Sequence, residues 1–97
     1  MQVRVRFYGF VQDVVGASRH ALEVPERSTL RNLFELLAER IGERLRERLF
    51  NKTGEIETNV RIFIGDNQAS SLEESLGDGQ RSPAEVKVFV LSATAGG

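Results

Sequence analysis

The chain has 97 residues, with 13 basic and 14 acidic side chains, a formal net charge of −1 and no cysteine. This length suits one domain that can bury a modest core. The absence of cysteine excludes disulfides, iron–sulfur clusters, thiolate zinc sites and a cysteine nucleophile. The balanced charge argues against nucleic-acid binding. Because no signal-like or long apolar segment is present, we expect no membrane association and a cytoplasmic location.

Two alternating segments open the chain. Residues 2–8 place Arg4 and Arg6 on one side and apolar residues on the other, namely Val3, Val5 and Phe7. Period two is typical of a half-buried strand. Residues 19–25 alternate again until Pro25, so we predict an antiparallel pair with an unusually long, apolar connection.

A helix is expected next, with Ser28 or Thr29 as its N-cap. Apolar residues follow at helical spacing and form one stripe, namely Leu30, Leu33, Phe34, Leu37 and Ile41. Gly42 interrupts the pattern, and a further short helical stretch precedes a polar turn over residues 51–55.

The second half predicts two more strands, over residues 59–64 and 85–91. Between them we expect a turn, then a short helical turn or irregular link over 71–76, then a loop. One main helix over a mixed sheet of four to five strands is an α+β, two-layer architecture.

A single helix covers only one face of such a sheet, so strand parity sorts the side chains. The uncovered face receives polar and basic residues, as expected, together with three apolar ones, Phe63, Phe89 and Leu91. An apolar cluster surrounded by Arg4, Arg6 and Arg61 on a solvated face predicts a docking patch for a partner protein.

Residues 91–97 read LSATAGG and end on Gly96 and Gly97. We expect residues 1–91 to form the domain and 92–97 a flexible tail. A terminal carboxylate is ionised at neutral pH, and glycine has no side chain to collide with a narrow channel. Fixing six residues costs on the order of 6–12 kcal/mol of conformational free energy. Burial of the three apolar side chains of the patch would contribute about 1.5–3 kcal/mol for each one. Together these contributions are of the same order as the cost of fixing the tail. We therefore predict that the sheet face docks while the tail enters a partner's site.

Four segments of the chain resemble a known family. They are VRVRFYGFVQDVVGAS, VPERSTLRNLFELLAER, LRERLFNKTGEIETNVRIFIGD and EVKVFVLSATAGG. In this order they are similar to the β-grasp sulfur carriers of the MoaD/ThiS type, which are relatives of ubiquitin and include the small subunit of molybdopterin synthase.

The resemblance implies a β-grasp fold and a role for the terminus. Gly97 would be adenylated by an ATP-using activating enzyme and converted to a thiocarboxylate, with Gly96 as its permissive neighbour. The sulfur would pass to a synthase large subunit or another acceptor, with molybdopterin biosynthesis as the leading interpretation. The chain would bind no cofactor and would not be an enzyme on its own.

Two alternatives remain open at this point. The same activation could end in conjugation of Gly97 to lysines of target proteins, as in ubiquitin-like modifiers. The chain could also be a non-covalent β-grasp binding module. We expect His20 to have a structural role and not to bind a metal ion, because one imidazole without cysteine or a second histidine makes a poor ligand set.

Overall fold

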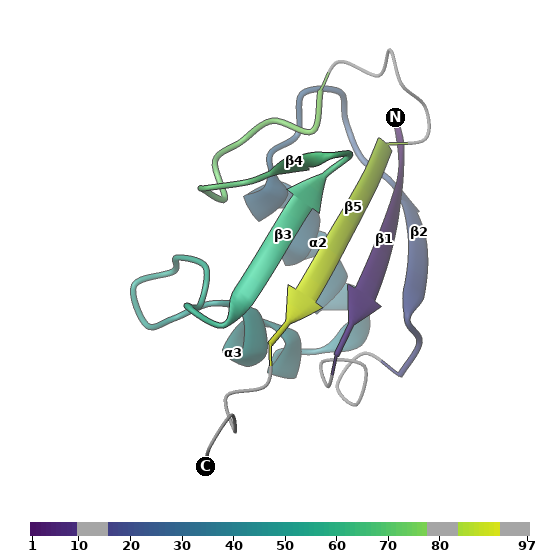
Figure 1. Ribbon diagram of the computed structural model, residues 1–97. Helices are drawn as coiled ribbons and strands as arrows, with labels where there is room; N and C mark the ends of the chain where they lie inside the picture. Colours follow the sequence, from purple (N-terminus) through teal and green to yellow (C-terminus); the bar gives the residue numbers. More distant parts are fainter. Residues whose placement is uncertain (10–15, 78–83, 92–97) are drawn as a thin grey trace.

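The alternating segments form a five-stranded mixed sheet in the computed structural model, which describes residues 1–9, 16–77 and 84–91 (Figure 1). The strands are β1 (Gln2–Tyr8), β2 (Arg19–Glu23), β3 (Val60–Ile64), β4 (Asn67–Gln68) and β5 (Ala84–Val90). Their order across the sheet is β2-β1-β5-β3-β4. β1 pairs in parallel with β5, whereas the β1–β2, β3–β5 and β3–β4 pairs are antiparallel. The mixed sheet predicted from the sequence is confirmed.

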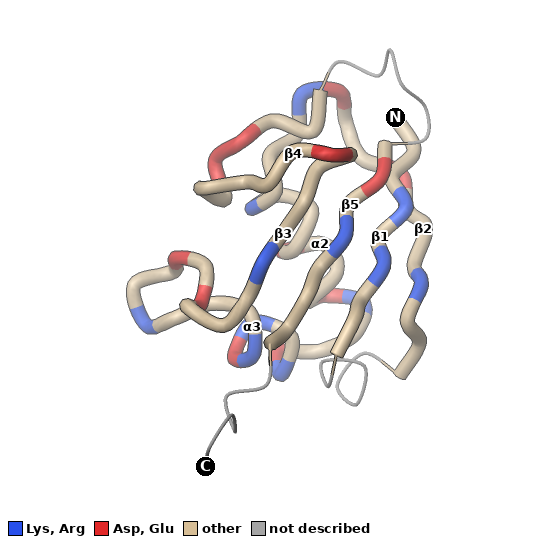
Figure 2. The backbone as a smooth tube through the Cα atoms, viewed as in Figure 1, with Lys and Arg blue, Asp and Glu red and all other residues tan. Residues whose placement is uncertain are grey.

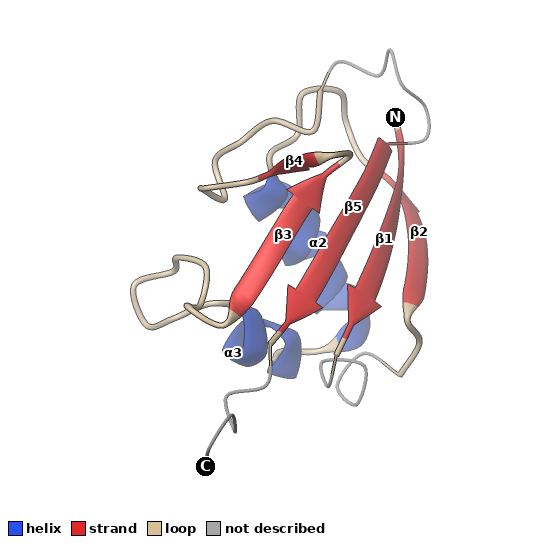
Figure 3. Cartoon of the chain, viewed as in Figure 1, coloured by secondary structure: helices blue, strands red, loops and turns tan. Residues whose placement is uncertain are grey.

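Two helices, α2 (Leu30–Ile41) and α3 (Arg44–Leu49), lie on the same side of the sheet (Figure 3). The apolar stripe of α2 faces the sheet, and Leu30, Leu33, Phe34 and Leu37 are fully buried. The expected strand parity is also confirmed, because Val3, Val5, Phe7, Val60, Ile62, Val86, Val88 and Val90 are all buried. Ile41 and Ile64 are only partly buried at the edges of this core. No helix among the described residues is long and apolar enough to cross a membrane.

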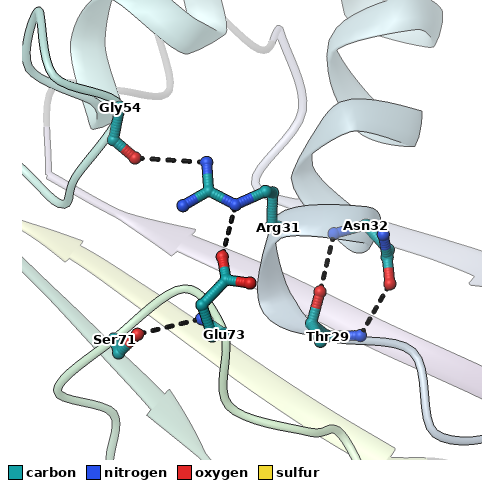
Figure 4. Close-up of polar contacts among 6 residues, drawn as sticks. All are labelled: Thr29, Arg31, Asn32, Gly54, Ser71 and Glu73. Carbon is teal, nitrogen blue, oxygen red and sulfur yellow. Dashed lines mark hydrogen bonds and ion pairs between the residues drawn. The ribbon is translucent and has the colours of Figure 1, made fainter.

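Thr29, one of the two expected caps, begins α2. Its Oγ1 accepts a hydrogen bond from the Asn32 N–H at 3.2 Å, and Asn32 Oδ1 accepts one from the Thr29 N–H at 3.0 Å (Figure 4). This capping box satisfies N–H groups that the first helical turn leaves without helical partners. The fixed start of α2 sets which of its faces meets the sheet.

Residues 69–77, which follow β4, form an irregular link tied to the start of α2. The Leu30 and Arg31 N–H groups donate to the carbonyls of Glu74 and Leu72, at 3.0 and 2.9 Å. The Arg31 side chain pairs with the Glu73 carboxylate and also donates to the Gly54 carbonyl at 3.3 Å (Figure 4). Arg31 therefore connects three segments that lie far apart in the sequence.

Glu74 organises the turn that begins this link. Its carboxylate accepts hydrogen bonds from the Ser70 N–H and hydroxyl and from the Ser71 N–H. These bonds favour the ionised form and lower the pKa of Glu74 below its ordinary value, with the Ser70 N–H as the largest cause. The strand β4 was expected only as part of a turn. It is two residues long and pairs with Phe63 and Ile64 of β3.

Candidate functional site

The sheet face opposite α2 and α3 is not covered by any described element of the chain (Figure 1). Residues paired across this face come from four neighbouring strands. Basic segments lie side by side on β2, β1, β5 and β3 in Figure 2. We call this surface the open face. Its apolar and basic residues are interleaved, because Phe63 lies opposite Lys87 and Arg61 lies opposite Phe89.

Three aromatic rings form the apolar part of the open face. Tyr8 and Phe89 lie opposite each other on the parallel strands β1 and β5, and their rings stack with centroids 4.6 Å apart and an interplanar angle of 10°. The Phe63 ring meets Phe89 edge-on, with centroids 5.6 Å apart. These are preferred aromatic geometries. We call Tyr8, Phe63 and Phe89 the aromatic cluster.

Leu91 extends this apolar surface at the end of β5. Residues two apart on an extended strand share a face, so Leu91 follows Phe89 on the open side of the sheet. Its side chain is 47% exposed, whereas the rings of the aromatic cluster are half-buried. The sequence placed Phe63, Phe89 and Leu91 together, and the structure brings them together. Tyr8 is an additional member that sequence reasoning missed, although its parity with Arg4 and Arg6 would have placed it there.

The path of the chain out of β5 is fixed on both sides. On one side, the Leu91 N–H donates to the Asn59 carbonyl at 2.8 Å, and Asn59 Nδ2 donates to the Leu91 carbonyl at 3.3 Å. On the other side, Gly9 has φ +93° and lies so close to β5 that an added Cβ would be 2.4 Å from the Val90 carbonyl oxygen. Only glycine fits this approach without displacement. Asn59 and Gly9 therefore hold the last described residues of β5 in place.

The basic residues of the open face differ in what they contact. Arg61 donates through Nη1 to the carbonyls of Thr58 and Val60, at 2.7 and 3.0 Å, so its guanidinium is held close to β3. Arg4 and Arg6 are exposed on β1. Lys87 of β5 lies opposite Arg6 and joins this basic group, although the sequence had not singled it out as a site residue.

The remaining candidate residues have simpler outcomes. Gly96 and Gly97 lie outside the described residues, as does the whole segment 92–97. The His20 ring packs edge-on against Phe7, with centroids 5.8 Å apart, and its Nε2 lies 3.1 Å from the Ala17 carbonyl oxygen. Over residues 1–9, 16–77 and 84–91, no three histidine or acidic side chains are grouped so that they could hold a metal ion.

The fold is shared with solved structures, whereas no protein-family model and no curated protein sequence matches the chain. SAMP1 from Haloferax volcanii superposes with a TM-score of 0.79 and 16% identity, over 96% of this chain and 98% of that one. Urm1 from Trypanosoma brucei superposes with a TM-score of 0.73 and 16% identity, over 95% of this chain and 93% of that one. A candidate molybdopterin converting factor, subunit 1, from Pyrococcus furiosus superposes with a TM-score of 0.71 and 23% identity, over 95% of this chain and 99% of that one.

These likenesses cover nearly the full length of each chain, at identities below one quarter. They therefore show that the chain shares the fold of these proteins, which in this chain has a parallel β1–β5 pair and a helix packed on one face of the sheet. In its fold the chain is a β-grasp, ubiquitin-like protein, as the resemblance implied.

Proposed function

We propose that this chain is a carrier substrate of an adenylating enzyme, which docks on the open face and activates the carboxylate of Gly97. One observation carries the proposal. The strand that bears Phe89 of the aromatic cluster leads through Leu91 directly into the segment that ends in Gly96 and Gly97. A partner that covers the cluster is thereby placed beside the start of that segment.

The chemistry needs no catalytic side chain from this protein. A carboxylate oxygen of Gly97 attacks the α-phosphorus of ATP, and pyrophosphate leaves with the electrons of the broken phosphoanhydride bond. A hydrosulfide-level donor then attacks the carbonyl carbon, and AMP leaves to give the thiocarboxylate. ATP and the catalytic groups belong to the partner. This chain supplies the docking surface and the slender terminus.

The apolar contribution to docking is smaller than the sequence suggested. Full burial of a large apolar side chain is worth about 1.5–3 kcal/mol, but the rings of Phe63 and Phe89 are already half-buried against each other. Leu91, with 47% of its surface exposed, has more area left to bury. A substitution of Leu91 is therefore expected to change docking on the open face more than a substitution of Phe63 or Phe89.

Sulfur transfer, with molybdopterin biosynthesis as its destination, is our first candidate for the step after activation. The similarity to a candidate molybdopterin converting factor subunit supports it. Conjugation through Gly97 to lysines of other proteins is the second candidate. The similarity to small archaeal modifier protein 1 from Haloferax volcanii, with TM-scores of 0.79 and 0.76 in two structures, supports this alternative.

The test is ATP–pyrophosphate exchange by the purified adenylating enzyme of the same organism. Full-length protein should support exchange, and a variant lacking Gly96 and Gly97 should not. Exchange that is equal with both proteins would refute activation at Gly97. It would leave the non-covalent binding module as the better interpretation.

A paired substitution tests the docking surface in the same assay. Leu91→Asp places a charge on the open face, and Leu36→Asp places the same charge on α2, where Leu36 is 39% exposed. We expect Leu91→Asp to raise KM at least tenfold, which corresponds to about 1.4 kcal/mol of lost binding, and Leu36→Asp to leave it near the wild-type value. Equal KM values for the two variants would remove the open face from the proposal.

A further inference from the structure

We propose that a row of three cations on the open face, Arg19, Arg6 and Lys87, binds an acidic surface segment of the adenylating partner. The inference rests on the proposed function and adds the chemistry of the surface that the partner presents. It follows from the strand register, from the contacts of these side chains and from the charges that border them.

The register places the three cations next to one another. Arg6 of β1 lies opposite Arg19 of β2 on one side and opposite Lys87 of β5 on the other. All three point to the same face, because directly paired residues share a face of the sheet. Neighbouring strands are about 4.8 Å apart, so the row is roughly 10 Å long. Like charges at directly opposed positions destabilise a sheet. Binding of an external anion explains why three cations occupy such positions here.

No carboxylate among residues 1–9, 16–77 and 84–91 forms an ion pair with the row. In the part of the chain that the structure describes, the side chains of Arg6, Arg19 and Lys87 form no ion pair and no hydrogen bond. Arginines elsewhere behave differently, since Arg31 pairs with Glu73 and Arg46 lies 3.7 Å from Glu43. The charges of the row are therefore available to an external anion.

A shallow groove lies between β1 and β2 at one end of the row. Its volume is about 330 Å³, and its cationic lining is Arg4, Arg6 and Arg19, with Ala21 between them on β2. At about 30 Å³ for each water molecule, the groove holds on the order of ten waters. Carboxylate side chains of a partner can enter it, replace this water and pair with the guanidinium groups in bidentate geometry.

The surroundings of the row favour a protein over a nucleic acid. Carboxylates lie on the side where β1 begins, with Glu85 opposite Arg4 and Glu23 opposite Gln2. The aromatic cluster borders the row in two places, because Phe63 of β3 lies opposite Lys87 at the end of the row, and Tyr8 and Phe89 form the next row after Arg6 and Lys87. Phosphates that run past the row would meet Glu85, and the whole chain has a net charge of −1. A partner protein with a small acidic surface segment next to an apolar surface would pair with the row and contact the aromatic cluster at the same time.

In this arrangement the row orients the encounter, and the aromatic cluster with Leu91 supplies apolar contact beside the exit of the tail. Complementary charges mainly raise association rates, and the effect weakens as salt screens them. Apolar contacts lack this salt dependence. The contributions of the row and of the aromatic cluster can therefore be distinguished by the salt dependence of the association rate constant.

The experiment measures association of the purified adenylating enzyme with wild-type protein and with two double variants, by stopped-flow at increasing KCl. Arg6→Glu/Lys87→Glu reverses two charges of the row. Arg44→Glu/Lys52→Glu, the matched control, reverses two exposed charges on α3 and in the turn after it. Both variants make the net charge more negative by the same amount. Circular dichroism and the melting temperature establish that each variant is folded.

We expect the association rate constant of Arg6→Glu/Lys87→Glu to fall at least tenfold below that of the control at low salt, within the range typical of electrostatic steering. The difference should shrink as KCl rises. Equal rate constants for the two variants, with normal ATP–pyrophosphate exchange by wild type, would overturn this inference and leave the proposed function standing. No association or exchange with wild-type protein would overturn both. Binding of a single-stranded RNA oligonucleotide that weakens as KCl rises and that Arg6→Glu/Lys87→Glu abolishes would assign the row to nucleic acid instead.

Discussion

Replacing Gly9 by alanine tests how the end of β5 is held in place. The new Cβ would lie 2.4 Å from the Val90 carbonyl oxygen, whereas ordinary contacts of such an atom begin near 3.4 Å. The Val90 carbonyl is backbone and belongs to the last residue of β5, so relief requires a shift of that strand end. The change should therefore destabilise the fold and displace Val90 and Leu91, the last residues described before the segment 92–97.

Gly16 provides the matched control, because its φ is +75° and no described residue other than its chain neighbour lies within 4 Å of an added Cβ. Both alanine variants bear the cost of a left-handed backbone, about 1–2 kcal/mol, and both restrict the unfolded chain in the same way. The difference between them isolates the contact with Val90. Forcing extra atoms into a packed site typically costs about 1–3 kcal/mol. For a domain of this size, each kcal/mol lowers Tm by about 4–8 °C.

Urea and thermal unfolding of the two variants, followed by circular dichroism, measure this difference. We expect Gly9→Ala to be less stable than Gly16→Ala by about 1–3 kcal/mol, and its KM in the exchange assay to rise because Leu91 is displaced. Equal stabilities would show that β5 accommodates the methyl group, and would refute the assignment of Gly9 as a residue that positions the strand end.

Three further predictions concern the scaffold. Leu37→Ala should cost about 2–5 kcal/mol because its side chain is fully buried, whereas Leu36→Ala on the same helix should stay within about 0.5 kcal/mol of wild type, as measured by urea unfolding; equal costs would contradict the assigned helix face. Thr29→Ala removes the hydroxyl that caps α2 and should cost about 1 kcal/mol by the same measurement, and an unchanged urea midpoint would count against the cap. Glu74 has a lowered pKa in the folded state, so it contributes stability above its ordinary pKa of 4.5 and loses that contribution as pH falls through the folded value. Glu74→Gln should therefore lose less stability than wild type on acidification, measured as Tm against pH, while an identical pH profile would refute this role.

Strand and helix positions could be predicted because each depends on a local pattern. Alternation in residues 2–8 fixed which side chains of β1 are buried, and Thr29 followed by an apolar stripe marked the start of α2. The same parity placed Phe63 and Phe89 on the uncovered face, where their rings meet. A pattern of period two contains this information without any knowledge of strand order.

Features that depend on pairing between distant segments could not be predicted. The parallel alignment of β1 with β5 brings Tyr8 against Phe89 and Arg6 beside Lys87, and no local signal fixes that register. The close approach of Gly9 to Val90 is also a product of this pairing.

The acidic pair Glu73 and Glu74 illustrates the same limit. In the sequence, two adjacent carboxylates in a polar segment indicate no more than a solvated surface. In the structure, Glu73 pairs with Arg31, which is 42 residues away, and Glu74 caps the turn at Ser70 and Ser71. Exposed charges at these positions carry a structural role that composition alone does not distinguish from solvation.

The most direct test of the central claim is the mass of the intact protein isolated from cells of its own organism, with fragmentation to locate any change. We predict a species in which one oxygen is replaced by sulfur and the change lies at Gly97, or, for the second candidate, a lysine peptide that carries the terminal glycines as a branch. The same measurement establishes whether Gly97 is the mature terminus. Protein that ends in an unmodified carboxylate under all growth conditions, with no branched peptide, would contradict the account.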